Sequence, residues 1–355
     1  MKRYSGSALL LFTFLLVTLS DLSAQTRGIQ VSVKTSKGRA IDLYRDSYAL
    51  VIGNGNYTDK GWDPLPGAVR DVKEVAEALK KQGFKVTLKT DLTRDGFNQA
   101  FSDFVFKHGA GKDNRLLFYY AGHGHTQQMA TDEQLGYLVM VDAPGPEDFG
   151  AFSLHSVDMV SVVTQAKNIY AKHALFIFDS CFSGSVLNLR DRVTPNTISD
   201  NVNQPVRQFI TAGRANEPVP DYSVFKQSFL DILEGGDEEP IRDGYLTGEE
   251  LGLYLKNKVP SYNKNQHPQY GKILDPKLDK GDFVFILASG GAIVEIPSST
   301  ARTTLSVQSN VSGARVTVDG KYVGTTDLSN VEVSSGEHRV SVEKEGYILC
   351  TTKKG

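Results

Sequence analysis

The stretch "HALFIFDSCFSG", residues 173–184, contains an unbroken apolar run that ends at a turn of small residues. A continuous run of this kind predicts a strand that is buried on both faces. Ser183 and Gly184 predict the tight turn that follows it. Cys181, one of only two cysteines among 355 residues, stands where the strand ends. A strand end holds a side chain rigidly and leaves its tip exposed, so this position suits a reactive thiol.

The same strand pattern recurs along the chain and alternates with helical patterns. Strands are predicted at 48–54, 84–90, 115–121, 136–142, 173–180, 206–213 and 280–287, and a strand or hairpin at 29–44. Helices are predicted at 68–82, 92–109, 155–171, 221–235 and 246–259. Such alternation predicts an α/β fold with a mostly parallel sheet and helices on both faces.

Four stretches follow strands of this sheet and are expected to meet. They are "GNGNY" (53–57), "AGHGH" (121–125), "DSCFSG" (179–184) and "TAGRANE" (211–217). In open α/β sheets, sites lie beyond the carboxyl ends of the strands. We therefore expect the functional site here, with Tyr57 and Trp62 either lining it or packing beside it. The polar segment "HPQYGK" (267–272) is expected to be a loop.

The first residues predict export. Lys2 and Arg3 precede an apolar run, and the small residue Ala24 follows it, as in a secretory signal peptide that is cleaved after Ala24. An uncleaved anchor helix is the alternative. A formal net charge of −2 gives no basic surplus for nucleic acid. We expect a secreted or periplasmic protein of the cell envelope, without a transmembrane helix after cleavage.

The two cysteines are not expected to pair, even though an exported protein favours disulfides. Cys181 and Cys350 lie in what the sequence predicts to be different domains. Cys181 is therefore expected to be free for chemistry. The alternative is a buried structural cysteine.

His123, in "AGHGH", is the natural partner of that thiol. An imidazole that helps a thiol lose its proton makes it a strong nucleophile. The N–H groups of Gly124 and Cys181 are the expected donors to an oxyanion. His125 follows two residues later, and we expect it to point elsewhere, although proton transfer by His125 is an alternative.

These residues resemble a known family. "YYAGHGH" and "FIFDSCFSG" resemble the two catalytic signatures of caspase-like cysteine peptidases, in the form found in metacaspases and their bacterial relatives. The histidine comes first, and Cys181 follows His123 by 58 residues (181 − 123), close to the roughly fifty of the caspase pattern. Other blocks in the same order extend the resemblance over about residues 45–288. It implies a three-layer α/β/α caspase-like fold, with His123 as the catalytic histidine and Cys181 as the nucleophile.

The resemblance also suggests which substrates are cut. True caspases use arginines to hold an aspartate before the scissile bond, but this chain has no arginine next to its cysteine. Metacaspase-like members instead use acids to hold a basic side chain. Asp71 and Asp179 match those acids, and Glu217 is a weaker third candidate. Carboxylates at the rim of one pocket would bind arginine or lysine, so cleavage after Arg or Lys is predicted. The alternatives are a helix-dipole role for Asp71 and a turn hydrogen bond for Asp179.

No cofactor is expected in the chemistry, and the sequence offers no metal-ligand cluster. The acidic segment 237–243 fails the calcium-loop template, because Pro240 and Ile241 stand where oxygen ligands are needed. Since some metacaspases are activated by calcium, the resemblance still leaves such activation open.

The last part of the chain predicts a separate small β module. Alternating residues with "DG" and "SG" turns run from about 304 to the end. They resemble a PEGA domain, a β-sandwich of bacterial envelope proteins, which suggests attachment or an envelope partner; a plain spacer is the alternative. The expected organisation is signal peptide 1–24, strand segment 25–46, peptidase domain 47–288, linker 289–303 and PEGA-like domain 304–355.

The sequence thus predicts an exported cysteine endopeptidase with a Cys–His dyad that acts on protein or peptide substrates. The rival hypothesis is a catalytically silent caspase-like module that binds proteins in the cell envelope. Retention of both Cys181 and His123 favours the enzyme.

Overall fold

The computed structural model describes residues 15–18, 31–34, 40–180, 203–214, 217, 222–235, 244–287, 303–309, 311–333, 338–344 and 350–354. The chain divides into two compact units, one of residues 27–294 and one of residues 1–26 with 295–355. The division after residue 294 falls within the predicted linker.

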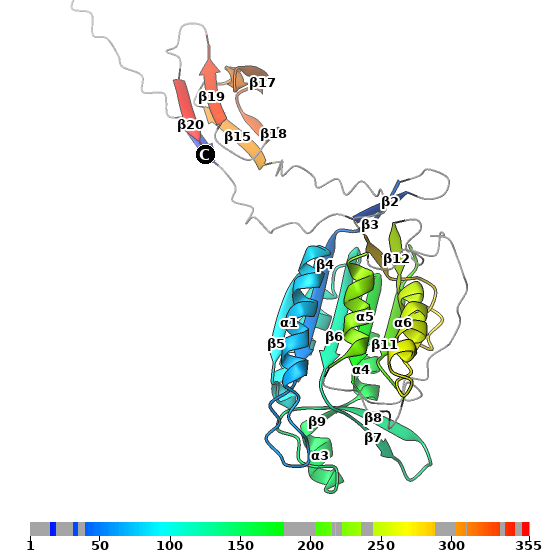
Figure 1. The fold of residues 1–355 in the computed structure, drawn as a ribbon. Coiled ribbons are helices and arrows are strands. Elements are labelled where there is room, and N and C mark those ends of the chain that lie inside the picture. The colour runs from blue at the N-terminus through cyan, green and yellow to red at the C-terminus, as the bar shows by residue number, and fades with distance from the viewer. Residues whose placement is uncertain are drawn as a thin grey trace, which may run out of the picture. The chain divides into compact units, whose positions relative to one another are not determined.

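A six-stranded sheet forms the centre of the larger unit (Figure 1). Its five parallel strands predict a site at their carboxyl ends. The sixth, at one edge, is antiparallel. The strand order is β13 (Gln269–Lys272), β11 (Val206–Thr211), β10 (His173–Asp179), β6 (Asn114–Ala121), β4 (Asp46–Gly53) and β5 (Lys85–Thr90). The expected loop at 267–272 is wrong in part, because Gln269–Lys272 pairs with β11 as an edge strand.

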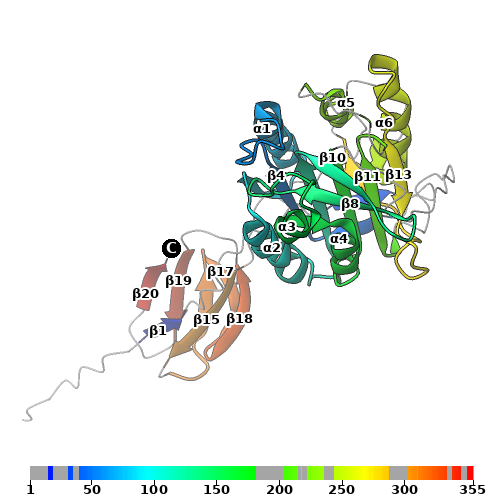
Figure 2. The ribbon, with the colours of Figure 1, turned by 90° about the horizontal axis from the view of Figure 1, so that it is seen from below.

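Three helices cover one face of this sheet, as Figure 2 shows. They are α1 (Pro66–Lys81), α5 (Val224–Leu233) and α6 (Gly248–Tyr262). In α1, Val72, Val75 and Leu79 recur at helical spacing and are fully buried. At the start of α6, Thr247 and Glu250 form the predicted capping box.

The opposite face is covered by α2 (Arg94–Ser102), the π-helical turn η1 (Asp103–His108) and α4 (Met159–Ala166). Their apolar side chains pack on an aromatic cluster centred on Phe118 of β6. The ring of Phe118 lies 5.2 Å from that of Phe101 and 6.0 Å from that of Phe176. Helices on both faces make the larger unit a three-layer α/β/α fold, as predicted.

A small antiparallel sheet lies beyond β6. It consists of β7 (Gly124–Gln128), β8 (Gln134–Val139) and β9 (Ser156–Asp158). The helix expected at 155–171 is therefore wrong in part: α3 (Phe149–His155) ends where β9 pairs with β8, and only then does α4 begin. Pairing with a distant strand overrides the local helical pattern.

At the amino ends of the parallel strands, a buried cation joins several elements. The hairpin β2 (Val31–Lys34) and β3 (Ala40–Tyr44) leads into the sheet, and β12 (Tyr245–Thr247) pairs with β14 (Val284–Ile286). Arg115 is 1% exposed and donates to the hydroxyl of Ser47 and to the carbonyl oxygens of Gln82 and Val284. Its guanidinium also lies 4.3 Å from the ring centre of Phe84.

The smaller unit is built from antiparallel strands, in agreement with the predicted β module. β16 (Arg315–Val318), β17 (Lys321–Thr325), β19 (His338–Glu343) and β20 (Cys350–Lys354) form one sheet. β15 (Thr303–Ser309) pairs with β18 (Leu328–Val333) and with β1 (Leu15–Thr18), the only described part of the predicted leader.

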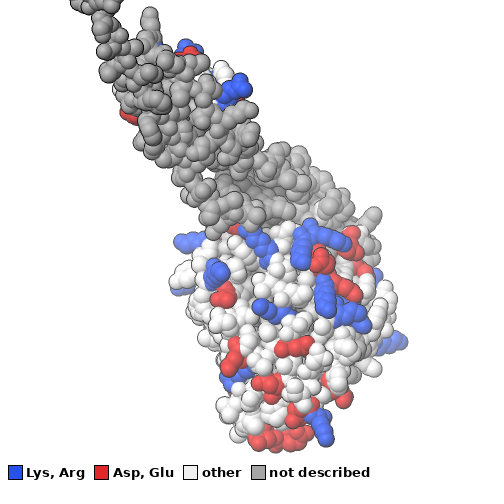
Figure 3. Space-filling model, turned by 90° about the vertical axis from the view of Figure 1, so that its left-hand side faces the viewer, with Lys and Arg blue, Asp and Glu red and all other residues white. Residues whose placement is uncertain are grey.

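Neither unit shows, in the residues described, a helix that is long and apolar enough to cross a membrane. Acidic and basic side chains are interspersed over the described part of the face in Figure 3. This mixed surface agrees with the formal net charge of −2.

Substitution of Phe118 by alanine tests the aromatic core. Phe118 is 0% exposed, so its removal leaves a cavity and should lower the free energy of unfolding by about 3–5 kcal/mol. Urea titration followed by tryptophan fluorescence measures the loss. Phe106→Ala is the matched control: this side chain is 57% exposed, and the loss should stay near 0.5 kcal/mol or below. Equal losses would contradict the assigned packing.

Candidate functional site

The carboxyl ends of the central strands lie side by side in register. Gly53 of β4 pairs with Ala121 of β6, and Ala121 pairs with Asp179 of β10. Beyond these pairs, the N–H of Asn54 donates to the carbonyl of Ala121 at 2.9 Å. The predicted convergence of strand ends is thus present in the described residues.

The turn after β6 fixes the backbone of His123. Its N–H donates to the hydroxyl oxygen of Tyr57 at 2.7 Å, and its carbonyl accepts from the N–H of Val139 at 3.0 Å. Gly122 precedes it with φ 156°, and a Cβ there would lie 2.8 Å from the hydroxyls of Tyr57 and Tyr120. Only glycine lets the backbone at position 122 approach the two tyrosine hydroxyls so closely.

The imidazole of His123 packs against two aromatic rings and a backbone carbonyl. Tyr57 lies at 4.7 Å and Trp62 at 5.4 Å between ring centres. Nε2 is 2.8 Å from the carbonyl oxygen of Asp63. A carbonyl only accepts, so Nε2 carries the hydrogen and Nδ1 holds the lone pair of the neutral ring. Burial lowers the pKa of His123, although the hydrogen bond to Asp63 opposes this shift. The ring is therefore a neutral base at neutral pH.

Cys181 lies outside the described residues, so its distance from His123 stays a prediction. The described chain reaches Asp179 and Ser180, both buried. The N–H groups of Gly124 and Cys181 likewise stay predicted oxyanion donors. Gly124 itself is the first residue of β7 and pairs with Leu138.

His125 packs against aromatic side chains and a neighbouring amide. Its ring meets Phe152 edge-on at 5.1 Å, and its Nε2 lies 3.3 Å from the side-chain oxygen of Gln127. Trp62 contacts both histidine rings. The ring is thus packed in the described structure, and proton transfer by His123 rather than His125 stays a prediction.

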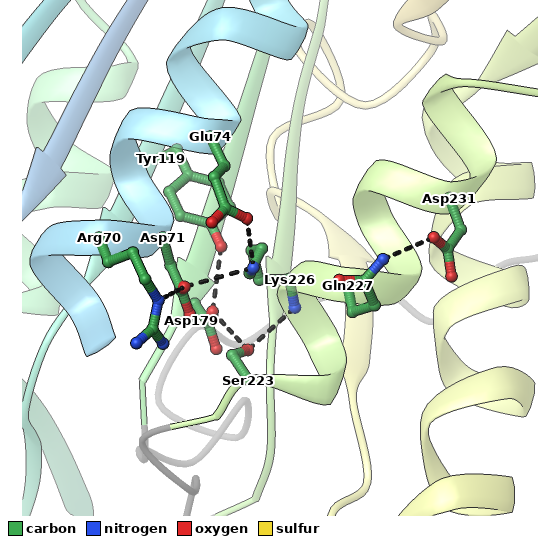
Figure 4. A network of polar contacts seen from close by, with 9 residues as sticks. All are labelled: Arg70, Asp71, Glu74, Tyr119, Asp179, Ser223, Lys226, Gln227 and Asp231. Atoms are coloured by element: carbon green, nitrogen blue, oxygen red, sulfur yellow. Dashed lines mark hydrogen bonds and ion pairs between the residues drawn. The ribbon is translucent and has the colours of Figure 1, made fainter.

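Asp179 lies inside the fold and is held by two hydroxyl groups (Figure 4). Its Oδ2 accepts from Ser223 at 2.6 Å and from Tyr119 at 3.0 Å. Its Oδ1 is buried and has no hydrogen-bond partner among the described residues. Burial raises the pKa of Asp179 to about 6, although both hydroxyl groups lower it.

Asp71 belongs to the same network but pairs with cations. Arg70 Nε lies 3.2 Å and Lys226 Nζ 3.3 Å from Asp71 Oδ1, and Lys226 Nζ lies 2.7 Å from Glu74 Oε2. We call Asp71 and Asp179 the acid pair. The structure brings the pair together, but at 2% and 5% exposed neither lies at an exposed rim.

Glu217 holds a neighbouring loop. One oxygen lies 2.7 Å from His267 Nδ1, and the other accepts from the N–H groups of His267 and Arg214, both at 2.8 Å. Burial raises the pKa of Glu217, but these hydrogen bonds outweigh it and the net pKa is lowered. Since both oxygens are occupied, Glu217 joins the end of β11 to the segment before β13 and is not brought into the acid pair's network.

The sequence contains a signal for Lys226. On the predicted helix, Lys226 precedes Phe229 and Leu233 by three and seven residues, so it falls on their buried face. A lysine on an apolar face requires a buried carboxylate partner. Asp63 gave no signal, because its contribution is a backbone carbonyl.

The described residues contain no group of three or more His, Cys, Asp or Glu side chains that could hold a metal ion. The acidic segment 237–243 lies outside the described residues. Calcium activation therefore stays an open expectation.

Comparisons with known proteins place both parts of the chain in known domain families. A family model described as "Caspase domain" matches residues 46–278, and one described as "PEGA domain" matches residues 302–353. A Geobacter sulfurreducens protein of known structure is 18% identical, with a TM-score of 0.46 over 66% of this chain and 97% of its own. Caspase-1 from Spodoptera frugiperda is 16% identical, with a TM-score of 0.44 over 67% and 90%. No curated protein matches the sequence.

Substitution of Asp179 by asparagine tests its raised pKa. From pH 4 to pH 6 the native carboxyl keeps a proton that the unfolded chain has released, so its contribution to stability falls as pH rises. The difference in unfolding free energy between the Asp179→Asn variant and the parent should therefore increase by up to about 3 kcal/mol from pH 4 to 7.5.

Urea titrations at a series of pH values measure this difference. Asp132→Asn, at an exposed position, is the control and should give a constant difference. A constant difference for Asp179→Asn as well would contradict the raised pKa.

Proposed function

Because the chain belongs to the caspase domain family, we propose that it is a cysteine endopeptidase with Cys181 as nucleophile and His123 as base. The observation that carries the proposal is the environment of His123. Its Nε2–H is bound by the Asp63 carbonyl at 2.8 Å, which leaves Nδ1 as the basic nitrogen of a ring with a lowered pKa.

The sheet register supports the pairing of these two residues. Ala121 and Asp179 lie opposite each other on neighbouring parallel strands. His123 and Cys181 each follow two residues later along their strands' direction. Equal offsets from a paired position favour close approach of the two side chains.

In the proposed reaction, His123 Nδ1 takes the thiol proton, and the Cys181 sulfur attacks the scissile carbonyl carbon. The N–H groups of Gly124 and Cys181 donate to the oxyanion. His123 then returns the proton to the leaving amine, the C–N bond breaks, and a thioester remains. Water, deprotonated by His123, attacks the thioester, and its collapse releases the acid and the thiol. The Asp63 carbonyl stabilises the imidazolium at each proton transfer.

We propose further that cleavage follows Arg or Lys. The support is a carboxylate cluster that reaches the described residues next to the nucleophile in sequence: Asp179 stands two residues before Cys181, and Asp71 belongs to the same network. Asp179 Oδ1 has no hydrogen-bond partner among the described residues, as a contact for a substrate cation would require. Glu217 is not needed for this role.

An extracytoplasmic location is proposed for the enzyme. The PEGA match at residues 302–353 supports it, because PEGA domains are typical of periplasmic and extracellular proteins. The predicted signal peptide at 1–24 points the same way. Attachment to an envelope partner through this module is proposed on the same grounds.

Three alanine variants test the dyad on fluorogenic peptides that end in Arg or Lys. Cys181→Ala and His123→Ala should each lower kcat/KM by roughly 10³-fold or more, because either change removes the nucleophile or its base. His125→Ala is the matched control and should stay within about threefold. If peptide cleavage survives in Cys181→Ala, or is absent in the parent chain, the protein is not this peptidase, and the protein-binding hypothesis replaces it.

A further inference from the structure

Lys226, a cation of the protein itself, pairs with one member of the acid pair. Lys226 lies in the first turn of α5 with its side chain 5% exposed, and its Nζ is 2.7 Å from Glu74 and 3.3 Å from Asp71 (Figure 4). Burial lowers the pKa of Lys226, but the two carboxylates outweigh it and the net pKa is raised. Lys226 is therefore an ammonium ion at neutral pH.

The helix start that carries Lys226 also organises Asp179. The Ser223 hydroxyl caps α5 by accepting from the N–H of Lys226 at 2.9 Å, and it donates to Asp179 Oδ2 at 2.6 Å. One turn of α5 thus contacts both members of the acid pair, with a hydroxyl for Asp179 and an ammonium for Asp71. Figure 4 shows the two contacts side by side.

The two acids are consequently unequal. Asp71 is balanced by Lys226 and by Arg70. On Asp179, Oδ2 is occupied by Ser223 and Tyr119, whereas Oδ1 is buried without a hydrogen-bond partner in the described part of the chain. One carboxylate oxygen therefore remains for an incoming cation.

We propose that Lys226 is a specificity-determining residue, which neutralises Asp71 from within the fold so that a substrate's basic side chain binds through Asp179 Oδ1 alone. The inference rests on the proposed function. A lysine ammonium is a point charge that one oxygen satisfies, whereas the arginine fork binds best to two acceptors. Lys226 thus favours lysine relative to arginine before the scissile bond.

Removal of the Lys226 charge should free Asp71 as the second acceptor, because the remaining partner, Arg70, has a side chain that is 55% exposed and holds Asp71 only weakly. In Lys226→Met, the ratio of kcat/KM for an arginine peptide to that for the matched lysine peptide should rise about tenfold, the effect of roughly one added charge-assisted hydrogen bond. Lys226→Gln removes the same charge but keeps a side chain that can hydrogen-bond to Asp71. It should shift the ratio in the same direction and provides a second test if the methionine variant does not fold.

Lys73→Met is the matched control, since it removes a lysine charge from an exposed position on α1. Its ratio should equal that of the parent chain, and thermal unfolding checks that each variant is folded. A ratio that stays within twofold in folded Lys226 variants, or that rises equally in Lys73→Met, overturns the inference.

The same assays separate this inference from the proposed function. Cleavage by the parent chain that is lost in Cys181→Ala supports the peptidase, and the Lys226 ratio then decides the specificity role. Absence of cleavage by the parent overturns the peptidase and, with it, the role of Lys226.

Discussion

The pairing of β6 with β10 is the constraint on which the site depends. Ala121 lies opposite Asp179, so the turn that carries His123 and the segment that leads to Cys181 leave the sheet at the same level. The register is fixed because both strands are buried on both faces. A slip by one residue would exchange the residues of the two faces and disrupt the packing of both helical layers.

Burial then governs the chemistry of each group at this edge. The neutral imidazole of His123 results from its aromatic surroundings, and the Asp63 carbonyl selects which nitrogen is basic. Burial also governs the two members of the acid pair, but each carboxylate is stabilised by a different kind of group. A carboxylate removed from water needs either hydrogen-bond donors or a counter-ion. Asp179 has the hydroxyls and Asp71 has the ammonium.

The fold could be predicted from the sequence where hydrophobic pattern alone decides the structure. The parallel strands, α1, α5, α6 and the capping box at Thr247 follow from apolar spacing and local capping chemistry. The pattern failed at Ser156–Asp158 and Gln269–Lys272, because partners distant in sequence determine both strands.

The site shows the same division. The motifs predict roles for His123, Asp71 and Asp179, and the strand topology predicts that His123 and Asp179 lie at one edge of the sheet. The pairing of Lys226 with Glu74 was not predicted, since it joins helices that are separated by more than half of the domain. The contact of His123 with a backbone carbonyl has no sequence signature. The relation of His123 to Cys181 stays a prediction.

At the opposite end of the sheet, the amino ends of the strands are joined by a buried arginine. Arg115 gathers Ser47, Gln82 and Val284 around one guanidinium, and burial lowers its pKa only to about 10, so the charge persists. This clamp joins β4, β6, β14 and the end of α1 without any help from the loops at the carboxyl ends. The loops at the carboxyl ends can therefore change in length and sequence while the scaffold remains intact, so the fold can persist while those loops diverge.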